Sequence, residues 1–334
     1  MSAAGLRTLA VVFDDPTTRD LGQEVLRAVG SVTRPEDGVR AIGYDLTSHG
    51  VTPAQSALPV AVTDELADCD AIVLATPGGP FPERRWSASL GKAFRHRVEV
   101  RSIKRFAATP SPLVGQPEID LVLVHDNDEG AYAENGGTHR KGTPHEIASE
   151  ISVNSADQVA AVVRYAFRIA QRRAHRRLTL VHKHNILLHT GQLWERTVSR
   201  VAREFPEVTA DYLHVDAAAM FVLTQPQRFD VVVTDGLFGG ILAGLGMTVS
   251  GDAAMTVTGR IDPTATYPPF FQPAHVPDDV REAGVSDARA SLLAAAMSLG
   301  HLGLGTWATA VEAVAARTRF GRRMRDGTPI VTPG

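Results

Sequence analysis

The chain has 334 residues, of which 44% are hydrophobic and 21% charged, a composition that excludes disordered and fibrous proteins. Its length predicts about two domains, since one core stops growing near roughly 250–300 residues. The net charge of −3 gives no electrostatic reason to expect nucleic acid as a partner. A single cysteine, Cys69, excludes an intrachain disulfide and fits a reducing compartment. No apolar run suits a membrane span and no signal peptide is evident, so we expect a cytoplasmic protein without a membrane partner.

Short apolar runs in the first part of the chain predict buried strands, with a helix over 19–29. These strands are expected at 9–13, 39–46, 70–76 and 119–124, with a turn at 76–80 (TPGGP) after the third. The stretch 92–105 is basic and is interpreted as a solvated face. The segment 125–143 is polar and rich in Gly, Asn, Asp and Glu.

Strands and helices alternate regularly in the middle of the sequence. Helices are expected at 155–173, 190–204 and 217–224 and from 238 onward, and strands at 178–181, 208–215 and 230–234. Ser155 with Gln158 predicts a capping box for the first of these helices. Two apolar helices, 288–302 and 305–316, follow near the end. This alternation predicts an α/β protein with a largely parallel sheet.

Residues just past the carboxyl ends of parallel strands face the ligand crevice of such a sheet. Lys183, Asp216 and the segment after Thr234 all occupy positions of this kind. Lys183 is one of only four lysines, beside Lys92, Lys104 and Lys141. A desolvated lysine can release its proton whereas arginine stays charged, so Lys183 is a candidate for chemistry.

Several motifs resemble, in order and spacing, the isocitrate/isopropylmalate family of β-decarboxylating dehydrogenases. HDNDEGAYAENGG (125–137) with HRKGT (139–143) is most similar to the tartrate/D-malate dehydrogenase branch. The further matching segments are VHKHN (181–185), DYLHVDAAAM (211–220), FDVVVTDGLFGG (229–240), YPPFFQPAH (267–275) and LLAAAMSLGHLG (292–303). Ordered motifs together are a strong signal where any one would be weak.

The resemblance implies a two-domain isopropylmalate-dehydrogenase-like fold with a non-contiguous large domain. The large, cofactor-side domain would comprise 1–98 plus 251–334, and the small dimerisation and substrate domain 99–250. It also implies a homodimer with shared active sites and a small carboxylic acid as substrate. The family's chemistry is NAD-linked oxidation of a 2-hydroxyacid, aided by Mg or Mn, followed by loss of the β-carboxylate and protonation of the enol.

The resemblance assigns roles to individual residues of this chain. The lysine that handles the hydroxyl proton falls on Lys183, and the asparagine after it on Asn185. The tyrosine that protonates the enol falls on Tyr132. The metal aspartate lent by the second subunit falls on Asp216, which we assign to substrate binding here.

Two further positions would bind the substrate's carboxylates. Arg101 keeps its place in the family's arginine clamp, whereas another clamp arginine is replaced by His125 and a third by Gly91. Losing guanidinium forks weakens recognition of a dicarboxylate. His125 could instead serve as an acid or base.

The two remaining metal aspartates of the family fall on Gly240 and Gly244. Because a divalent cation needs oxygen ligands, chiefly carboxylates, we expect no Mg or Mn and assign no metal ligand. Asp235, at the end of the same strand, is the one conceivable replacement.

The cofactor region also departs from the family pattern. His275 and Asp287 are the candidate NAD-binding residues, but a glycine is replaced by Val276 and the loop is one residue shorter. An aspartate in place of the adenine-facing amide removes a hydrogen-bond donor. NAD binding is therefore expected to be possible but weak.

Three hypotheses about function remain open from the sequence. The one we favour at this point is a repurposed enzyme that uses Lys183 and Tyr132 for metal-independent decarboxylation, enolisation or dehydration of a small acid. The second is NAD-dependent oxidative decarboxylation of a malate- or tartrate-type 2-hydroxyacid. The third is a catalytically silent homologue that acts as a binding or partner subunit.

Overall fold

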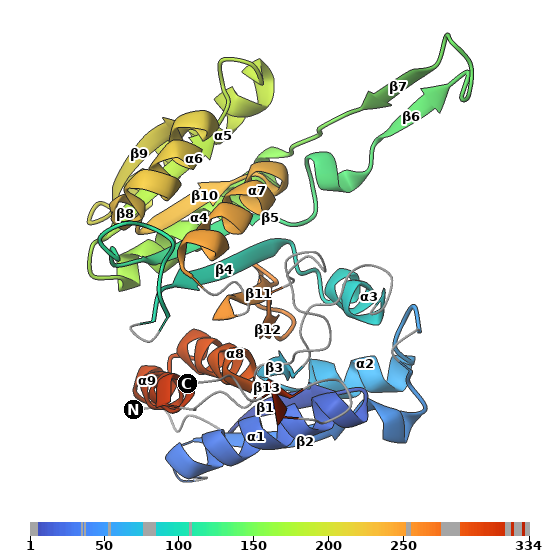
Figure 1. Ribbon diagram of the computed structural model, residues 1–334. Coiled ribbons are helices and arrows are strands. Elements are labelled where there is room, and N and C mark those ends of the chain that lie inside the picture. Colours follow the sequence, from blue (N-terminus) through green and yellow to red (C-terminus); the bar gives the residue numbers. More distant parts are fainter. Residues whose placement is uncertain are drawn as a thin grey trace. The chain divides into compact units, whose positions relative to one another are not determined.

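A computed structural model describes residues 6–34, 36, 38–52, 55–75, 85–106, 109–251, 255–274, 288–317, 322–323 and 329–330. Contacts divide the chain into two units, of which unit 1 comprises Met1–His96 with Asp252–Gly334 and unit 2 comprises Arg97–Gly251. The expected turn at 76–80 lies outside the described residues. The protein has an α/β fold with largely parallel sheet structure (Figure 1).

Unit 1 is built on strands in the order β2-β1-β3-β12-β11. The strands are β1 (Arg7–Phe13), β2 (Val39–Asp45), β3 (Ala71–Leu74), β11 (Val257–Ile261) and β12 (Phe270–Pro273), with the short pair β13 (Arg322–Arg323) and β14 (Pro329–Ile330). The helices are α1 (Pro16–Val32), η2 (Leu46–His49), α2 (Val60–Ala67), α3 (Arg85–Ala93), α8 (Ala288–His301) and α9 (Gly305–Arg317). Strands β1, β2, β3 and β12 pair in parallel, whereas β11 is antiparallel to β12 and β13 is antiparallel to β14.

The local sequence explains how unit 1 begins. The apolar run of β1 is buried in the sheet. Asp15 then caps α1, because its side chain accepts the Thr18 amide while the Thr18 hydroxyl accepts the Asp15 amide. Trp86 and Phe270 lie fully buried in the core of this unit.

Unit 2 is built on strands in the order β4-β5-β10-β8-β9. The strands are β4 (Val98–Lys104), β5 (Asp120–Asp126), β8 (Arg177–His182), β9 (Thr209–His214) and β10 (Val231–Thr234), with the pair β6 (Gly136–His139) and β7 (Ile147–Glu150). The helices are η3 (Ala131–Ala133), α4 (Ala156–Arg172), α5 (Leu188–Val201), η4 (Ala202–Glu204), α6 (Val215–Thr224), η5 (Pro226–Arg228) and α7 (Gly236–Val249). Strand β4 is antiparallel to β5, and the other neighbours are parallel.

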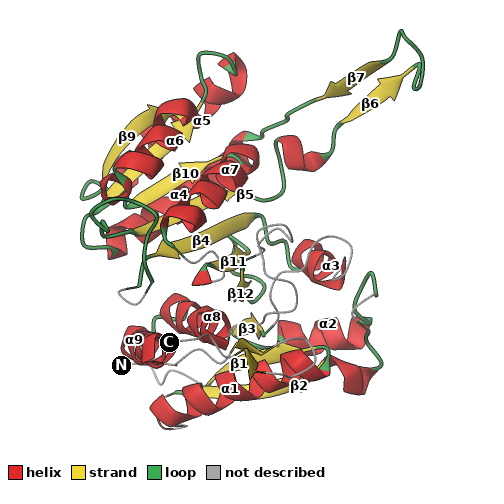
Figure 2. Ribbon diagram, viewed as in Figure 1, coloured by secondary structure: helices red, strands yellow, loops and turns green. Residues whose placement is uncertain are grey.

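Helices cover both faces of the unit 2 sheet (Figure 2). Helices α6 and α7 pack against one face, where Ile103, Leu121 and Val232 meet Leu242. Helices α4 and α5 cover the other face. Sheets covered on both sides need nearly continuous apolar strands, which explains runs such as VVVT in β10.

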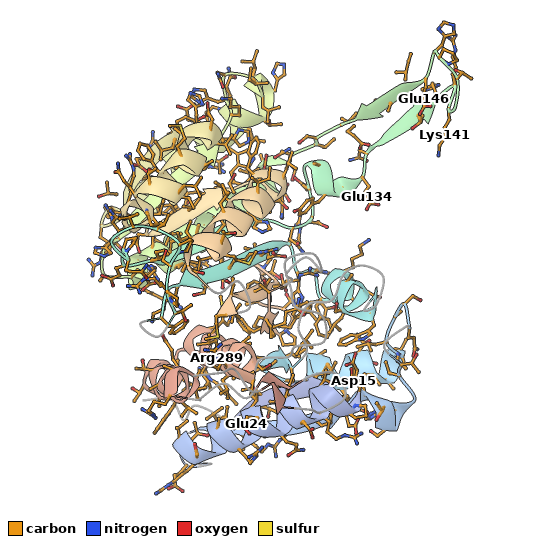
Figure 3. The ribbon with its side chains drawn as sticks, in the orientation of Figure 1. Asp15, Glu24, Glu134, Lys141, Glu146 and Arg289 are labelled. Carbon is orange, nitrogen blue, oxygen red and sulfur yellow. The ribbon has the colours of Figure 1, made fainter. Side chains whose placement is uncertain are left out.

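Strands β6 and β7 form an antiparallel hairpin that extends from unit 2, and all of their residues are exposed. Glu134 at its base and Lys141 and Glu146 near its tip project away from the ribbon (Figure 3). A two-stranded hairpin has little stability by itself.

Two local expectations are corrected by the structure. The stretch interpreted as a solvated basic face contains β4, whose Val98, Val100 and Ile103 are buried. The Ser155 side chain does accept the Gln158 amide, as expected of a cap. The Gln158 side chain, however, is buried and donates to Asp126, so the reciprocal half of the capping box does not form.

Candidate active site

Polar side chains gather at one edge of the unit 2 sheet, where its parallel strands end. In the register of these strands, Thr234 pairs with His125 and His182 pairs with His214. Asp126, Asp235 and Lys183 belong to the same edge, at or one residue past the ends of β5, β10 and β8. Ligands of α/β sheets bind outside the carboxyl ends of the strands. This edge is the candidate active site.

Lys183 is held by an ion pair at this edge. Its Nζ lies 2.9 Å from Oδ2 of Asp216 in the first turn of α6, and its side chain is only 25% exposed. The hydrogen bond from Lys183 lowers the pKa of the Asp216 carboxyl below its usual value. Asn185 lies exposed in the turn that follows Lys183. The structure thus brings Lys183 and Asp216 together within one chain, and their roles stay predictions.

Tyr132 lies against the first turns of α7, on η3, and its side chain is 45% exposed. A Cβ added to Gly236 would lie 2.9 Å from its ring, and one added to Gly240 would lie 3.1 Å from its hydroxyl. These two glycines therefore leave room for the tyrosine on the helix surface. A phenol placed this way can deliver a proton to a molecule bound at the sheet edge.

Arg101 and His125 share one carboxylate that the sequence analysis did not single out. Oε1 of the buried Glu99 accepts Nε of Arg101 at 2.8 Å and lies 3.3 Å from Nε2 of His125. The other ring nitrogen of His125 lies 2.8 Å from the backbone oxygen of Asp126. His125 is almost fully buried. It is therefore placed to orient Glu99 and Arg101 and does not reach the solvent-facing site.

Three more buried titratable groups lie behind this edge. Burial raises the pKa of both Asp126 and Asp235. Burial, followed by the charge of His184, lowers the pKa of His182 to about 4. Nε2 of His182 lies 3.6 Å from Oδ2 of Asp235, longer than a hydrogen bond, and both groups favour their neutral forms.

The described residues do not fit the metal site that the resemblance implies. They contain no group of three or more His, Cys, Asp and Glu placed to hold an ion. Gly240 and Gly244 supply no ligand, and Asp235 is engaged as the cap of α7, accepting the Phe238 amide at 2.8 Å. Replacement of the missing carboxylates by Asp235 therefore has no support in this geometry.

The candidate NAD residues His275 and Asp287 lie outside the described residues, so their assignment stays a prediction. The start of α1 in unit 1 is among the described residues. Asp15 and Thr18 cap this helix end, and Asp14 accepts Nε1 of Trp86 at 3.2 Å. The Asp15 side chain thus already accepts one of the amides at this helix N-terminus, that of Thr18.

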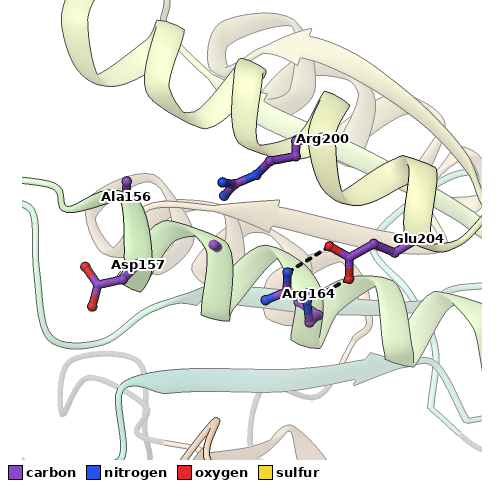
Figure 4. A pocket seen from close by; sticks show the side chains of 6 residues that line it. Ala156, Asp157, Arg164, Arg200 and Glu204 are labelled. Atoms are coloured by element: carbon purple, nitrogen blue, oxygen red, sulfur yellow. Dashed lines mark hydrogen bonds and ion pairs between the residues drawn. The ribbon is translucent and has the colours of Figure 1, made fainter.

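A pocket of about 590 Å³ opens elsewhere in unit 2, beside α4 and α5 (Figure 4). It is lined by Ala156, Asp157, Ala160, Arg164, Arg200 and Glu204. Both oxygens of Glu204 accept from Arg164, at 2.8 and 2.9 Å. None of the expected site residues lines this pocket, and it is not the candidate active site.

Comparison with known proteins agrees with the α/β fold. A model of the isocitrate/isopropylmalate dehydrogenase family matches residues 17–326. The chain belongs to this family. The crystal structure of isocitrate dehydrogenase from Methylococcus capsulatus is similar with a TM-score of 0.72 and 28% identity, over 95% of this chain and 92% of that one.

Two curated relatives, both named 3-isopropylmalate dehydrogenase, match this chain over most of its length. The 3-isopropylmalate dehydrogenase of Corynebacterium efficiens is 46% identical over 325 residues, which cover 94% of this chain and 93% of the relative. That of Frankia casuarinae is 42% identical over 314 residues, covering 92% and 91%. These names do not support the expected similarity to the tartrate/D-malate branch.

The same relatives correct the functional interpretation drawn from the sequence. The favoured hypothesis, a repurposed enzyme with metal-independent acid–base chemistry, is wrong, and so is that of a silent homologue. Identity near 40% over most of the chain to named dehydrogenases indicates ordinary dehydrogenase function in an oxidoreductase family. The replacements at Gly240 and Gly244 carried too much weight in that hypothesis.

None of the described helices combines the length and the apolar character that a membrane crossing requires.

Proposed function

We propose that this protein catalyses NAD-linked oxidation of a small 2-hydroxyacid of the 3-isopropylmalate class, followed by loss of the β-carboxylate. The relatives named 3-isopropylmalate dehydrogenase support the substrate class. The observation that carries the proposal is the Lys183–Asp216 pair at the carboxyl end of β8. This edge is where α/β enzymes bind their substrates.

Lys183 first gives up the proton of its ion-paired ammonium to solvent, and the neutral amine then takes the proton of the C2 hydroxyl in the proposed oxidation. NAD, when bound, would accept the hydride from C2, and a 2-oxo acid would remain. Asp216 stabilises the ammonium that Lys183 becomes, since an opposite charge within hydrogen-bond distance favours the charged form. A positioned acid–base group of this kind contributes about 10²–10⁴-fold to the rate.

Tyr132 acts in the second half of the reaction. The β-carboxylate leaves as CO₂ and its bonding electrons form an enolate. The enolate carbon that lost the carboxylate takes up a proton from the Tyr132 hydroxyl. Solvent then returns a proton to the tyrosine. The position of the hydroxyl over Gly240 and the 45% exposure of Tyr132 support this role, because the residue is open to a bound molecule and to water.

Arg101 binds a carboxylate of the substrate. Glu99 holds its Nε at 2.8 Å, which fixes the plane of the guanidinium. The terminal nitrogens of such a planar group suit a carboxylate. His125 supports this arrangement through its contact with the same Glu99 oxygen.

The protein works as a homodimer in this proposal. Large apolar side chains on α6 and α7 are exposed in the single chain, among them Met220 (67%) and Ile241 (53%). The hairpin of β6 and β7 is also uncovered, although Ile147 and Ile151 are apolar. A second copy would bury both features, and large apolar patches on a protein surface commonly mark such interfaces.

Steady-state assays of the purified protein test the proposal. NADH formation is measured with NAD and, in parallel, 3-isopropylmalate, D-malate and tartrate. The proposal requires turnover with 3-isopropylmalate that exceeds turnover with the other two acids. Preference for D-malate or tartrate would move the substrate class to the tartrate/D-malate type.

A further inference from the structure

Tyr212 on β9 binds the peptide groups on both sides of Lys183. Its hydroxyl donates to the backbone oxygen of His182 at 3.0 Å. The backbone amide of His184 donates to the same hydroxyl at 3.3 Å. One phenol therefore spans the residue that the proposed reaction uses as its base.

Three polar groups lie within hydrogen-bond distance of this hydroxyl. A phenol carries one proton and two acceptor lone pairs. The proton goes to the His182 carbonyl and one lone pair accepts from the His184 amide, and Nδ1 of His214 lies 3.0 Å from the same oxygen. Burial raises the pKa of Tyr212, so its hydroxyl keeps the proton that this arrangement needs.

The backbone of Lys183 also forms hydrogen bonds that do not involve Tyr212. Its carbonyl accepts the amides of Ile186 at 3.0 Å and Leu187 at 2.8 Å. Together with the two bonds of Tyr212, these contacts bind the carbonyl before Lys183, its own carbonyl and the amide after it. These contacts therefore fix the backbone position from which the Lys183 side chain extends.

The Tyr212 ring is held in place from two sides. It stacks on the His184 imidazole at 4.5 Å between centroids, with the planes 3° apart, and His214 packs edge-on at 5.2 Å. The charged and titratable groups around it are His182, His184 and His214, with Glu195 against His184 and Asp216 against Lys183. Both the hydroxyl and the counter-ion come from one short segment, 212–216.

We propose that Tyr212 is a positioning residue that holds Lys183 against Asp216 by bonding the peptide groups on either side of the lysine. This inference rests on the proposed role of Lys183 in oxidation. Position is decisive here, because displacing a catalytic group by about 1 Å can cost about 10²-fold in rate.

The scarcity of lysine permits a direct test without substrate. Reductive methylation with ¹³C-formaldehyde labels the amino terminus and the four lysines, Lys92, Lys104, Lys141 and Lys183. Loss of one signal in Lys183→Arg assigns its resonance. The two methyl groups on a nitrogen differ in environment only while the side chain is held, so their separation reports the fixed ion pair.

Tyr212→Phe removes the hydroxyl and keeps the ring that stacks on His184. We expect the two Lys183 methyl signals to shift and merge, while those of the other three lysines stay unchanged and show that the fold is intact. Tyr44→Phe is the matched control, since it also removes a bonded tyrosine hydroxyl, here donated to Glu65 in unit 1. The control should leave the Lys183 signals as they are.

Kinetics supply the second readout. Tyr212→Phe should lower kcat by about 10–100-fold with little change in KM, because the substrate contacts remain and the base is displaced. Unchanged Lys183 signals in Tyr212→Phe would overturn the inference. If the Lys183 signals shift in Tyr212→Phe but the native protein has no dehydrogenase activity, the positioning role of Tyr212 stands and the proposed function is refuted.

Should Tyr212→Phe fail to fold, the native protein decides the matter by hydrogen exchange. The His184 amide donates to Tyr212, so its exchange must be slowed relative to a free peptide. Exchange at the rate of an unstructured peptide would overturn the inference.

Discussion

The hydroxyl of Tyr132 lies over Gly240, so close that a Cβ added to this glycine would be 3.1 Å from the phenol oxygen. The ring continues over Gly236, one turn earlier on α7. A glycine inside a helix costs stability relative to alanine. Here the missing side chains make room for the proposed proton donor.

Alanine at Gly240 should therefore affect activity through Tyr132. The neighbouring hydroxyl must yield by a few tenths of an ångström, so we expect kcat to fall in Gly240→Ala while the fold is retained. Gly244→Ala is the matched control, because nothing lies within 4 Å of a Cβ at that position. The control should raise stability by about 0.5–1 kcal/mol and leave kcat unchanged. Equal activity of both variants would refute the role of the Tyr132–Gly240 contact.

Carboxylates at Gly240 and Gly244 should strengthen the binding of divalent metal. Hard cations need several oxygen ligands, and the described residues at this edge do not group enough of them. Titration of Mn²⁺ by calorimetry should give a lower Kd for the double variant Gly240→Asp, Gly244→Asp than for the native protein. A native protein that binds Mn²⁺ as tightly as the double variant would show that other residues complete the site.

His182 should make the protein less stable in acid. Its pKa in the folded protein is lowered from 6.5 to about 4 by burial, so the unfolded chain binds a proton that the folded one does not. The stability is therefore complete above about pH 6.5 and is lost as the pH falls toward 4, by about 3 kcal/mol in total. His96, buried in unit 1 with its pKa also lowered to about 4, adds a loss of the same sign.

Urea unfolding at several pH values separates the two histidines. In His182→Leu the loss of unfolding free energy between pH 6.5 and 4 should be reduced but not abolished, since His96 remains. His145→Leu, on the exposed hairpin turn, is the control and should keep the native pH dependence. The account of His182 fails if its removal leaves that dependence unchanged.

The apolar faces of α6 and α7 should hold two copies together. Ile241→Glu places a charge on an exposed side chain, so the isolated chain should tolerate it. At an apolar interface an unpaired buried charge is costly, and we expect the variant to sediment as a monomer. Val60→Glu, at the exposed start of α2 in unit 1, is the control and should remain dimeric. A native protein that is already monomeric at micromolar concentration would contradict the proposed assembly.

Continuous apolar runs let much of the fold be predicted from the sequence. The strands around 119–124, 178–181 and 230–234 are found close to the expected positions, as β5, β8 and β10. Lys183 lies at the strand end where the pattern put it. Such strands are recognisable because both of their faces are buried, which requires apolar residues at nearly every position.

Strand β4 could not be recognised in this way. Its sequence VEVRSIK carries two charges that bind each other within the fold, through Glu99 and Arg101. The sequence alone does not distinguish a charged residue that is paired inside a sheet from one that is exposed to solvent. The contact of Glu99 with His125 depends on the antiparallel pairing of β4 with β5, a long-range relation that no local pattern contains.

The contacts of Tyr212 could not be predicted from the sequence for a similar reason. Its sequence position, in an expected strand, predicts packing. Its three polar partners belong to His182 and His184 near the end of β8 and to His214 on its own strand. Only the parallel register of β8 and β9, in which His182 pairs with His214, brings them together.

Dehydrogenase activity that depends on Lys183 is the central claim, and paired assays of two lysine variants test it most directly. NADH formation from 3-isopropylmalate is measured for the native protein, for Lys183→Ala and for Lys141→Ala, the latter on the exposed hairpin turn. The account predicts turnover in the native protein and in Lys141→Ala, and a kcat about 10²–10⁴-fold lower in Lys183→Ala. Full activity of Lys183→Ala, or a folded native protein that forms no NADH from any 2-hydroxyacid tested, would contradict it.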